Sequence, residues 1–457
     1  MSLAHLGLLI VFVLLGNGLR SVVSSSVFVS EGQFASFLKI SVTQTSAVIE
    51  LLLGAVLLSL LVAPRLLARG QPQHLAVAMI LLSGSAALGL AALFYISPGV
   101  DLREAVILVV FPLLGFGLAC LAPQAQLMTG WGGATHKDML TGIWAAAMPA
   151  AFLVTPQLVR IIAPRYGLDG FFLVFAVITF ALIPVVLMLR PPENTAPQDA
   201  AQASPFPLAP AIAALLAFEL MTGLVTLQGI VSPWTWGAAA LFLVALAYLW
   251  LHMPKRDGQA PRAAASGGAV LILAYLFFVN MATTGFYDTS YLVDHLCSST
   301  LVANRATLGA AAQVAAAAIT SALLARYTWS TPMILVGAVF TAAGLGAYLL
   351  YFTMPFDWVY IGSKVVNGFG MGILATAAIF AVSKGAGGAG LALFTAFIII
   401  IGTEVGLEIF EIFVQVMQLW QVHDDTTYSV IFLAQLGLVA LAAPLVVLAH
   451  RKNIAPV

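Results

Sequence analysis

Residues 364–372 read KVVNGFGMG, and residues 115–117 carry the same GFG sequence 253 positions earlier. A second match is LLAR, which occurs at 66–69 and again 257 positions later at 323–326. Each match lies inside a long apolar run or closes one. Because the two offsets nearly agree, we predict that the chain contains an internal repeat.

The composition is that of a membrane protein. Of the 457 residues, 61% are hydrophobic and 8% are charged, whereas a soluble domain carries about 25% charged residues. The 18 basic and 18 acidic residues cancel, so no net charge points to nucleic acid. The sequence has no HExxH motif, nucleophile elbow or phosphate loop, so we predict neither an enzyme nor a bound cofactor.

The apolar runs are long enough to cross a bilayer, which takes about 20 residues of helix. We predict an all-α polytopic protein with fourteen spans, at 3–29, 41–64, 73–96, 105–129, 138–162, 168–189, 208–231, 235–253, 269–295, 301–325, 331–353, 358–382, 389–418 and 428–449. Polar linkers divide them into a six-helix bundle (1–190), a linker with two inserted helices (191–268) and a second six-helix bundle (269–457).

The distribution of Lys and Arg predicts the orientation, because cytoplasmic loops carry an excess of them. With the N-terminus inside, four basic residues fall outside: Lys39, Arg103, Arg160 and Arg165. Eleven fall on the cytoplasmic side: Arg65, Arg69, Lys137, Arg190, Lys255, Arg256, Arg262, Arg326, Lys384, Arg451 and Lys452. We therefore expect both termini in the cytoplasm and the protein in the cytoplasmic (inner) membrane, with the first span retained rather than cleaved.

These features together resemble the major facilitator superfamily, whose members pair two six-helix bundles around a solute site near the midplane. Residues 63–70 (APRLLARG) are similar to that family's basic loop between the second and third helices. Residues 364–372 are similar to its Arg/Gly motif, with Lys364 in place of arginine, while the first copy has Phe111 there. The resemblance implies alternating access and a monomer that transports a small solute.

Two further features resemble exporters of this family. Residues 138–144 (DMLTGIW), followed by Pro149 and Pro156, are similar to the fifth-helix region of exporters. Two helices inserted between the halves are typical of the fourteen-helix drug:proton antiporters. That branch has an acidic residue in its first helix, where this chain has Arg20.

Charges at bilayer depth cost at least about 2.5–3.5 kcal/mol each, so each one needs a partner or a function. The intramembrane acids are Glu50, Glu219, Asp288, Glu404, Glu408 and Glu411, and the bases are Arg20, Arg305 and Lys364. Matching depth predicts three pairs: Arg20 with Glu50, Asp288 with Arg305, and Lys364 with Glu411. They are either packing salt bridges or partners exchanged during transport.

Three acids follow one another on the thirteenth span. Glu404, Glu408 and Glu411 are spaced i, i+4 and i+7, which places them on one helix face. Burial and a like-charged neighbour both disfavour the charged form of a carboxyl group, so such a group can hold a proton near neutral pH. We assign these three residues and Asp288 to proton coupling; the alternative is a face that merely stays hydrated. Glu219, in the inserted pair, has no assigned role.

Polar residues in the first two helices of each half are candidates for solute binding, because the first helix of each half lines the central cavity in the resembled family. The candidates, with the base of the twelfth span, are Asn17, Arg20, Glu50, Asn280, Tyr287, Arg305 and Lys364.

The sequence leaves three solute hypotheses. The leading one is a proton-coupled exporter of a small amphipathic or cationic organic solute, favoured by the excess of intramembrane acids. The second is an importer or facilitator of an anionic or zwitterionic solute anchored by Arg20. The third is a metal-ion exporter that uses hard carboxylate ligands.

Overall fold

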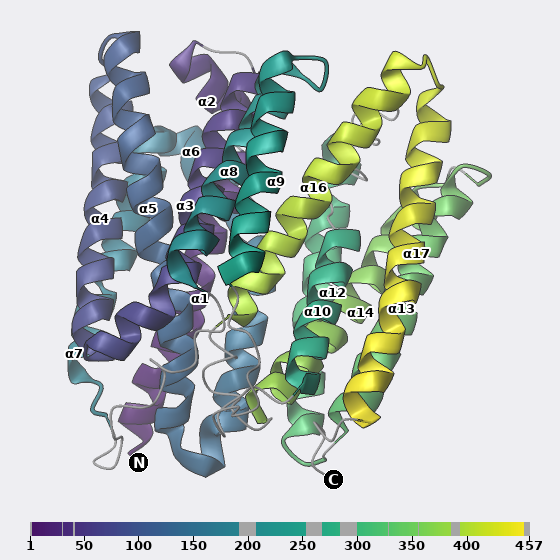
Figure 1. Ribbon diagram of the computed structural model, residues 1–457. Coiled ribbons are helices and arrows are strands. Elements are labelled where there is room, and N and C mark those ends of the chain that lie inside the picture. The colour runs from purple at the N-terminus through teal and green to yellow at the C-terminus, as the bar shows by residue number, and fades with distance from the viewer. Residues whose placement is uncertain are drawn as a thin grey trace. The chain divides into compact units, whose positions relative to one another are not determined.

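The computed structural model describes residues 2–29, 31–39, 42–191, 207–252, 267–283, 299–327, 329–354, 356–384 and 394–451, and every regular element in these ranges is a helix (Figure 1). The first part of the chain forms α1 (Leu3–Val29), α2 (Glu31–Leu38), α3 (Val42–Arg69), α4 (Pro72–Ile96), α5 (Val100–Met128), the 3₁₀ turn η1 (Thr129–Gly132), α6 (Gly133–Phe180) and α7 (Leu182–Met188). Next come α8 (Leu208–Gln228) and α9 (Pro233–His252). The last part forms α10 (Gly267–Ala282), α12 (Ser299–Leu324), α13 (Ser330–Tyr351), α14 (Asp357–Lys384), α16 (Thr395–Leu419) and α17 (Asp424–Arg451). The all-α membrane fold predicted from the apolar runs is confirmed.

Eleven helices of the described part are long and apolar enough to cross a membrane. Two more helices do not meet the length and charge criteria for a membrane span. The described part of α10 has only 16 residues, and α16 carries three acids, Glu404, Glu408 and Glu411. One of the eleven combines two spans, because α6 is interrupted at Gly167, where φ is 70°. An uninterrupted helix of 48 residues would be about 70 Å long, over twice the thickness of a bilayer core. The predicted count of fourteen is consistent with these helices.

The second span ends later than the apolar run suggested. α3 continues through Pro64 to Arg69 and leaves Gly70 and Gln71 before α4 begins at Pro72. Membrane helices tolerate an internal proline when neighbouring groups satisfy the freed carbonyl. Arg69 in the last turn also suits the negative end of the helix dipole. Residues 63–69 are therefore helical rather than a loop.

The chain divides into two compact units that are each described separately. Unit 1 comprises residues 1–133 and 154–261, and unit 2 comprises 134–153 and 262–457. This grouping differs from a linear division at residues 190 and 268, because the first part of α6 packs with unit 2. The inserted helices α8 and α9 belong to unit 1. Two six-helix bundles with an inserted pair remain the predicted organisation.

In unit 1, α5 packs between α3 and α4, and its two glycines permit the close approach. A Cβ on Gly115 would lie 2.7 Å from the carbonyl oxygen of Leu52 in α3. A Cβ on Gly117 would lie 3.0 Å from the carbonyl oxygen of Met79 in α4. The first glycine of the GFG sequence thus contacts one neighbour and the second glycine contacts the other.

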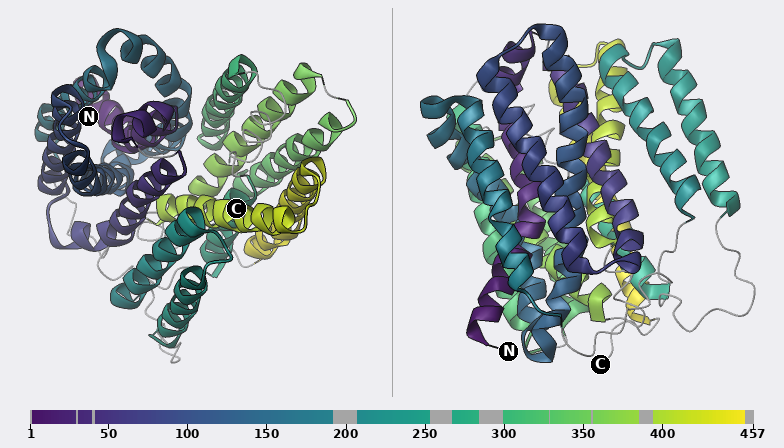
Figure 2. Two further views of the ribbon diagram at one scale, coloured as in Figure 1. Left: turned by 90° about the horizontal axis from the view of Figure 1, so that it is seen from above. Right: turned by 90° about the vertical axis from the view of Figure 1, so that its left-hand side faces the viewer.

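Unit 2 repeats this arrangement, with α14 packed between α12 and α13. Gly368 lies against the backbone of Gly309 in α12, and a Cβ on Gly370 would lie 2.8 Å from the carbonyl oxygen of Gly337 in α13. Gly309 is 257 positions after Leu52, and Gly337 is 258 positions after Met79. The repeat predicted from the sequence is therefore present in the contacts of both units. Within each unit the helices are packed side by side (Figure 2).

The inserted pair is a helical hairpin (α8 and α9, teal in Figure 1). α8 ends because Gly229 adopts φ 73° and its N–H donates to the Val225 carbonyl at 2.8 Å. The Thr235 hydroxyl donates back to the Gly229 carbonyl at 2.8 Å, which closes the turn. The rings of Phe218 and Phe242 lie 5.5 Å apart, where α8 packs against α9.

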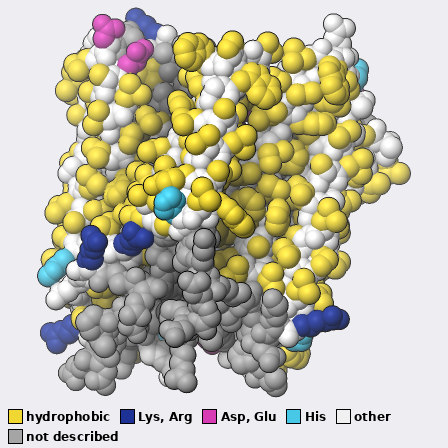
Figure 3. All heavy atoms as spheres, viewed as in Figure 1, with side chains coloured by type: hydrophobic (Ala, Val, Ile, Leu, Met, Phe, Trp, Pro, Cys, Tyr) yellow, Lys and Arg dark blue, Asp and Glu magenta, His cyan; other side chains and the backbone are white. Residues whose placement is uncertain are grey.

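Hydrophobic side chains cover most of the face shown in Figure 3, where Lys and Arg side chains appear only at the upper edge and in the lower part. On α9 the exposed aromatic residues gather at both ends, with Trp234 and Trp236 at one and Tyr248 and Trp250 at the other. Trp234 and Trp250 are about 24 Å apart along the axis at 1.5 Å per residue. Tryptophan and tyrosine favour the two membrane–water interfaces, so this spacing suits a membrane-spanning α9.

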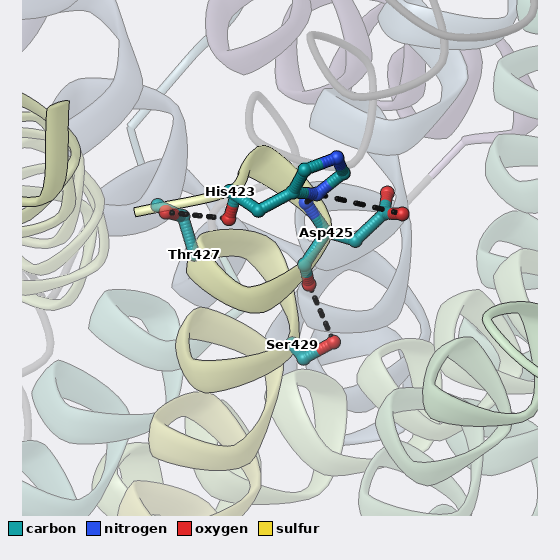
Figure 4. A network of polar contacts seen from close by, with 4 residues as sticks. All are labelled: His423, Asp425, Thr427 and Ser429. Atoms are coloured by element: carbon teal, nitrogen blue, oxygen red, sulfur yellow. Dashed lines mark hydrogen bonds and ion pairs between the residues drawn. The ribbon is translucent and has the colours of Figure 1, made fainter. Parts of the chain in front are cut away.

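α17 begins in a polar turn (Figure 4). The Asp425 N–H donates to His423 Nδ1 at 3.3 Å, and the Thr427 hydroxyl donates to the His423 carbonyl at 3.3 Å. The Ser429 hydroxyl donates to the Asp425 carbonyl at 2.6 Å. His423 Nδ1 also lies 3.8 Å from the Asp425 carboxylate. Because Nδ1 already accepts the Asp425 backbone N–H, we do not interpret the 3.8 Å approach to the carboxylate as an ion pair. Asp424 and Asp425 suit the positive end of the α17 dipole.

Candidate functional site

The first polar centre lies on α1 in unit 1. Asn17 and Arg20 are buried, with 2% and 6% of their surfaces exposed, and Arg20 Nη2 donates to Asn17 Oδ1 at 3.5 Å. The Ser24 hydroxyl donates to the Arg20 carbonyl at 3.2 Å. These residues share one side of the helix because they are spaced i, i+3 and i+7. α1 therefore carries a positive, hydrogen-bonding row of side chains, and the role of Asn17 and Arg20 in solute binding remains a prediction.

α5 adds two buried amides to unit 1, where it packs against α1 at Gly16. Gln124 Nε2 donates to Cys120 Sγ at 3.4 Å. Among the described residues, Gln124 Oε1 and both amide atoms of Gln126 are buried without a hydrogen-bond partner. Buried polar atoms of this kind are rare and often face a ligand or water. Neither Gln124 nor Gln126 is among the solute-binding residues predicted from the sequence.

Glu50 lies at the contact between α3 and the inserted helix α8. The Thr226 hydroxyl of α8 donates to Glu50 Oε1 at 2.6 Å. On the same contact, a Cβ on Gly54 would lie 2.7 Å from Glu219 Oε2, so each helix brings one carboxyl group to the other. The proximity of Glu50 and Glu219 was not predicted. The pairing of Arg20 with Glu50 remains a prediction.

Arg305 of α12 is the centre of an aromatic site in unit 2. Only 1% of its surface is exposed, and its Nη2 donates to the Tyr348 hydroxyl of α13 at 2.9 Å. Its guanidinium carbon lies 4.3 Å from the ring centroid of Tyr360 in α14 and 5.2 Å from that of Tyr348. A cation over an aromatic face is stabilised by the ring quadrupole, most strongly where water is excluded.

A chain of hydroxyl groups continues from Arg305. The Tyr348 hydroxyl is hydrogen-bonded to the Ser363 hydroxyl, which donates to the Tyr360 carbonyl at 2.8 Å. The Tyr351 ring meets the Tyr360 ring edge-on at 4.8 Å. The sequence showed Arg305 as a buried charge but did not identify its tyrosine partners, since they come from two other helices.

Lys364 lies one helical turn after Tyr360 on α14. A Cβ on Gly309 would lie 2.7 Å from Lys364 Cγ, so the lysine stem crosses α12 at that glycine. Its predicted partner, Glu411, accepts a hydrogen bond from Gln415 Nε2 of its own helix at 3.3 Å. The structure therefore places the Lys364 stem against α12, one helical turn after Arg305, and the pairing of Lys364 with Glu411 remains a prediction.

The three acids of α16 lie on a helix that packs tightly on α10. A Cβ on Gly402 would lie 2.6 Å from the Phe277 carbonyl oxygen, and Gly406 lies against the Met281 backbone, which is the close small-xxx-small packing of membrane helices. Glu408 is 5% exposed, and Glu404 and Glu411 are partly buried.

The remaining candidates have separate positions. Asn280 Nδ2 donates to the Leu276 carbonyl of its own helix at 2.7 Å, next to the contact with Gly402. Tyr287 and Asp288 lie outside the described residues. In the described part of the chain, no group of three or more His, Cys, Asp or Glu side chains could hold a metal ion.

Comparisons with known proteins place the fold. No family model matches the chain, and no curated protein matches it. Among solved structures, the major facilitator proton:xylose symporter XylE bound to 6-bromo-6-deoxy-D-glucose is similar at a TM-score of 0.66 and 12% identity, over 97% of this chain and 95% of that one. A bacterial homologue of the iron transporter ferroportin in its outward-facing state is similar at 0.64 and 13%, over 97% and 99%. An autoinhibited peptide transporter of the POT family is similar at 0.54 and 16%, over 97% and 96%.

The chain thus has the fold of the major facilitator superfamily along nearly its whole length. It is a multi-pass membrane protein built on the architecture of secondary transporters.

Proposed function

We propose that this chain is a proton-coupled secondary transporter of a small organic solute, working by alternating access. The observation that carries the proposal is the row of carboxyl groups on α16, in which Glu408 is buried and Glu404 lies one helical turn away. Two carboxyl groups at this spacing in a low-dielectric site are most stable when a proton neutralises one of them. A solute cycle that changes their surroundings can then take up and release that proton.

The fold supports this reading by analogy. The structurally similar protein XylE is a proton:xylose symporter, so the architecture accommodates proton coupling. α16 packs on α10 through Gly402 and Gly406, and a backbone-to-backbone contact of this kind has few side chains to rearrange when helices slide.

Of the solute classes expected from the sequence, we favour an anionic or zwitterionic one. Arg305 is buried on α12, and the stem of Lys364 on α14 crosses α12 at Gly309. Two basic side chains on one pair of packed helices suit a solute that carries a carboxylate. For direction we propose export by proton antiport, because residues 138–144 resemble the fifth-helix region of exporters.

Replacing Glu408 or Glu404 with glutamine, which mimics the protonated carboxyl group, tests the proposal. In proteoliposomes loaded with members of a panel of radiolabelled organic acids, amines and sugars, both variants should lose transport driven by a pH gradient. Exchange of solute without a gradient should continue, because the remaining site is intact. Glu104→Gln removes an exposed acid at the start of α5 and is the matched control. Full gradient-driven transport by both α16 variants would show that these residues do not couple protons.

A further inference from the structure

α2 is a short helix at one end of unit 1, where it joins α1 to α3. It lies at the end opposite the start of α1 (Figure 1), which the distribution of Lys and Arg predicts to face outside. One side of α2 is buried, with Phe34 and Leu38 each 1% exposed, whereas Gln33 and Ser36 are exposed. α2 therefore has a docked face and a free face.

The docked face places one ring among three other helices. The Phe34 ring meets Phe94 of α4 edge-on at 5.2 Å and Phe111 of α5 edge-on at 5.7 Å. It also meets Phe172 of α6 edge-on at 6.1 Å. Phe94 and Phe172 stack on each other at 5.8 Å, so part of this aromatic cluster is built without α2. α2 completes the cluster and covers it.

Arg103, in the first turn of α5, joins the C-terminal ends of two helices. Its Nη1 donates to the Phe37 carbonyl in the last turn of α2, and its guanidinium carbon lies 4.4 Å from the Phe37 ring centroid. Its Nη2 donates to the carbonyl of Ser97, directly after α4, at 3.1 Å and to the Ser97 hydroxyl at 2.8 Å. A cation suits both helix ends, because the last carbonyl groups of a helix lack partners within it and carry partial negative charge.

The residues that follow these two helices are both in the left-handed region of the backbone. Lys39 follows α2 with φ 58°, and Ser97 follows α4 with φ 50°. Lysine and serine rarely adopt this conformation, which persists where the surroundings impose it. The docked position of α2 is thus stabilised by Arg103 and opposed by local backbone strain.

α2 also depends on its docking to be a helix at all. It has 8 residues, whereas isolated helices shorter than about 12 residues are marginal in water. Its stability must come from the burial of Phe34 and Leu38 and from the bonds of Arg103. Segments with so few buried contacts open at a lower free energy than the core of a protein.

We propose that α2 is a lid on the outer end of unit 1, that Arg103 latches it, and that it opens while the rest of the unit remains folded. α2 connects α1, which carries Asn17 and Arg20, to α3, which carries Glu50. Opening of the lid releases the outer ends of these two helices from α4, α5 and α6, so that they can move during transport. This inference goes beyond the proposed function and does not depend on proton coupling.

Cysteine labelling of the purified full chain in detergent tests the lid. Ala35→Cys in a Cys297→Ser background places a thiol on the docked face of α2, where Ala35 is 7% exposed. Cys120 of α5 is fully buried and reports opening of the whole unit. With a charged maleimide, the thiol at position 35 should react at least about tenfold faster than Cys120, because a local opening precedes global unfolding. Ser36→Cys, at an exposed position of the same helix, gives the rate of an accessible thiol.

Variants of the latch should change the rate at position 35 in opposite directions. Arg103→Gln should raise it by about tenfold or more, since a hydrogen bond to a charged group is worth at least one tenfold step. It should leave the rate at Cys120 unchanged. Lys39→Gly should lower the rate at position 35 several-fold, because glycine adopts the left-handed conformation without strain. Arg160→Gln removes an exposed base of α6 in the same unit and is the matched control.

Hydrogen exchange of the chain without an added cysteine is an independent measurement. The peptide that covers 31–39 should exchange before the peptides of α4 and α5, and Arg103→Gln should accelerate that peptide alone. The proposal is overturned if position 35 reacts no faster than Cys120, if Arg103→Gln leaves its rate unchanged, or if α2 exchanges only together with α5. Failure of the proposed proton coupling would not alter these results, because they involve neither a solute nor a pH gradient.

Discussion

Tyr348 uses its hydroxyl group twice, to accept a hydrogen bond from Arg305 and to bond Ser363. Only 2% of its surface is exposed, so water cannot replace a lost partner. The ring also stacks on Phe432 at 5.3 Å, which fixes its orientation independently of the hydroxyl. A change that removes only the oxygen therefore isolates the hydrogen bonds.

Tyr348→Phe should lower the free energy of unfolding by about 1.5–3 kcal/mol, the range for a hydrogen bond to a charged group that is left buried. The measurement is denaturant unfolding of the purified protein. Tyr327→Phe, at an exposed tyrosine (47%), is the control and should change stability little. Equal stability of Tyr348→Phe and the unaltered chain would show that this bond does not hold Arg305.

At this scale the sequence identifies isolated charges better than their partners. Arg20, Arg305, Lys364 and Glu408 stand out because a charge in an apolar run is costly. Which residues meet them depends on helix rotation, which apolar periodicity barely defines when a helix is apolar on every side. Depth could therefore suggest Glu411 as a partner for Lys364, but it could not predict that the lysine stem crosses α12 at Gly309.

Among the elements, α14 packs closely against α12 and α13 in unit 2. Its Gly370 faces α13, where a Cβ would lie 2.6 Å from Thr341 Oγ1 and would meet the Thr341 backbone nitrogen even more closely. On the same helix a Cβ on Gly362 would meet nothing within 4 Å. The two glycines share a helix but differ in their surroundings.

Gly370→Ala should cost about 1–3 kcal/mol of stability, because the added methyl group must push two backbones apart. Gly362→Ala should cost nothing measurable. Unfolding temperatures of the two variants in the same detergent provide the comparison. A Gly370→Ala protein as stable as Gly362→Ala would contradict the close α13–α14 contact.

The existence of these elements could be predicted because a run of about 20 apolar residues has few alternatives in a membrane. The GFG repeat also predicted that α5 and α14 are equivalent, and the contacts of Gly115 and Gly368 agree. The ends of these helices were harder to predict, because a proline such as Pro64 usually ends a helix but is tolerated within α3. The docking of α8 on α3 through Glu50 and Thr226 could not be predicted, because nothing in either run specifies its neighbour.

For the whole molecule, the excess of Lys and Arg on one side predicts that both termini are cytoplasmic. A reporter fused after Val457 should report the cytoplasm. One inserted between Val231 and Trp236, at the tip of the α8–α9 hairpin, should report the outside. The paired reporters form their own control, because they must differ. A cytoplasmic signal from the hairpin tip would mean that α8 and α9 do not cross the membrane.

Proton coupling is the central claim, and solute-triggered proton movement tests it most directly. Purified protein is placed in liposomes that contain a pH-sensitive dye, the organic acid panel is added outside, and the pH of the lumen is followed against protein-free liposomes. We predict that at least one solute raises the lumenal pH, as antiport of solute for protons requires, and that Glu408→Gln abolishes the response. Entry of a solute through the protein with no change of lumenal pH, or an unaltered response in Glu408→Gln, would contradict the account.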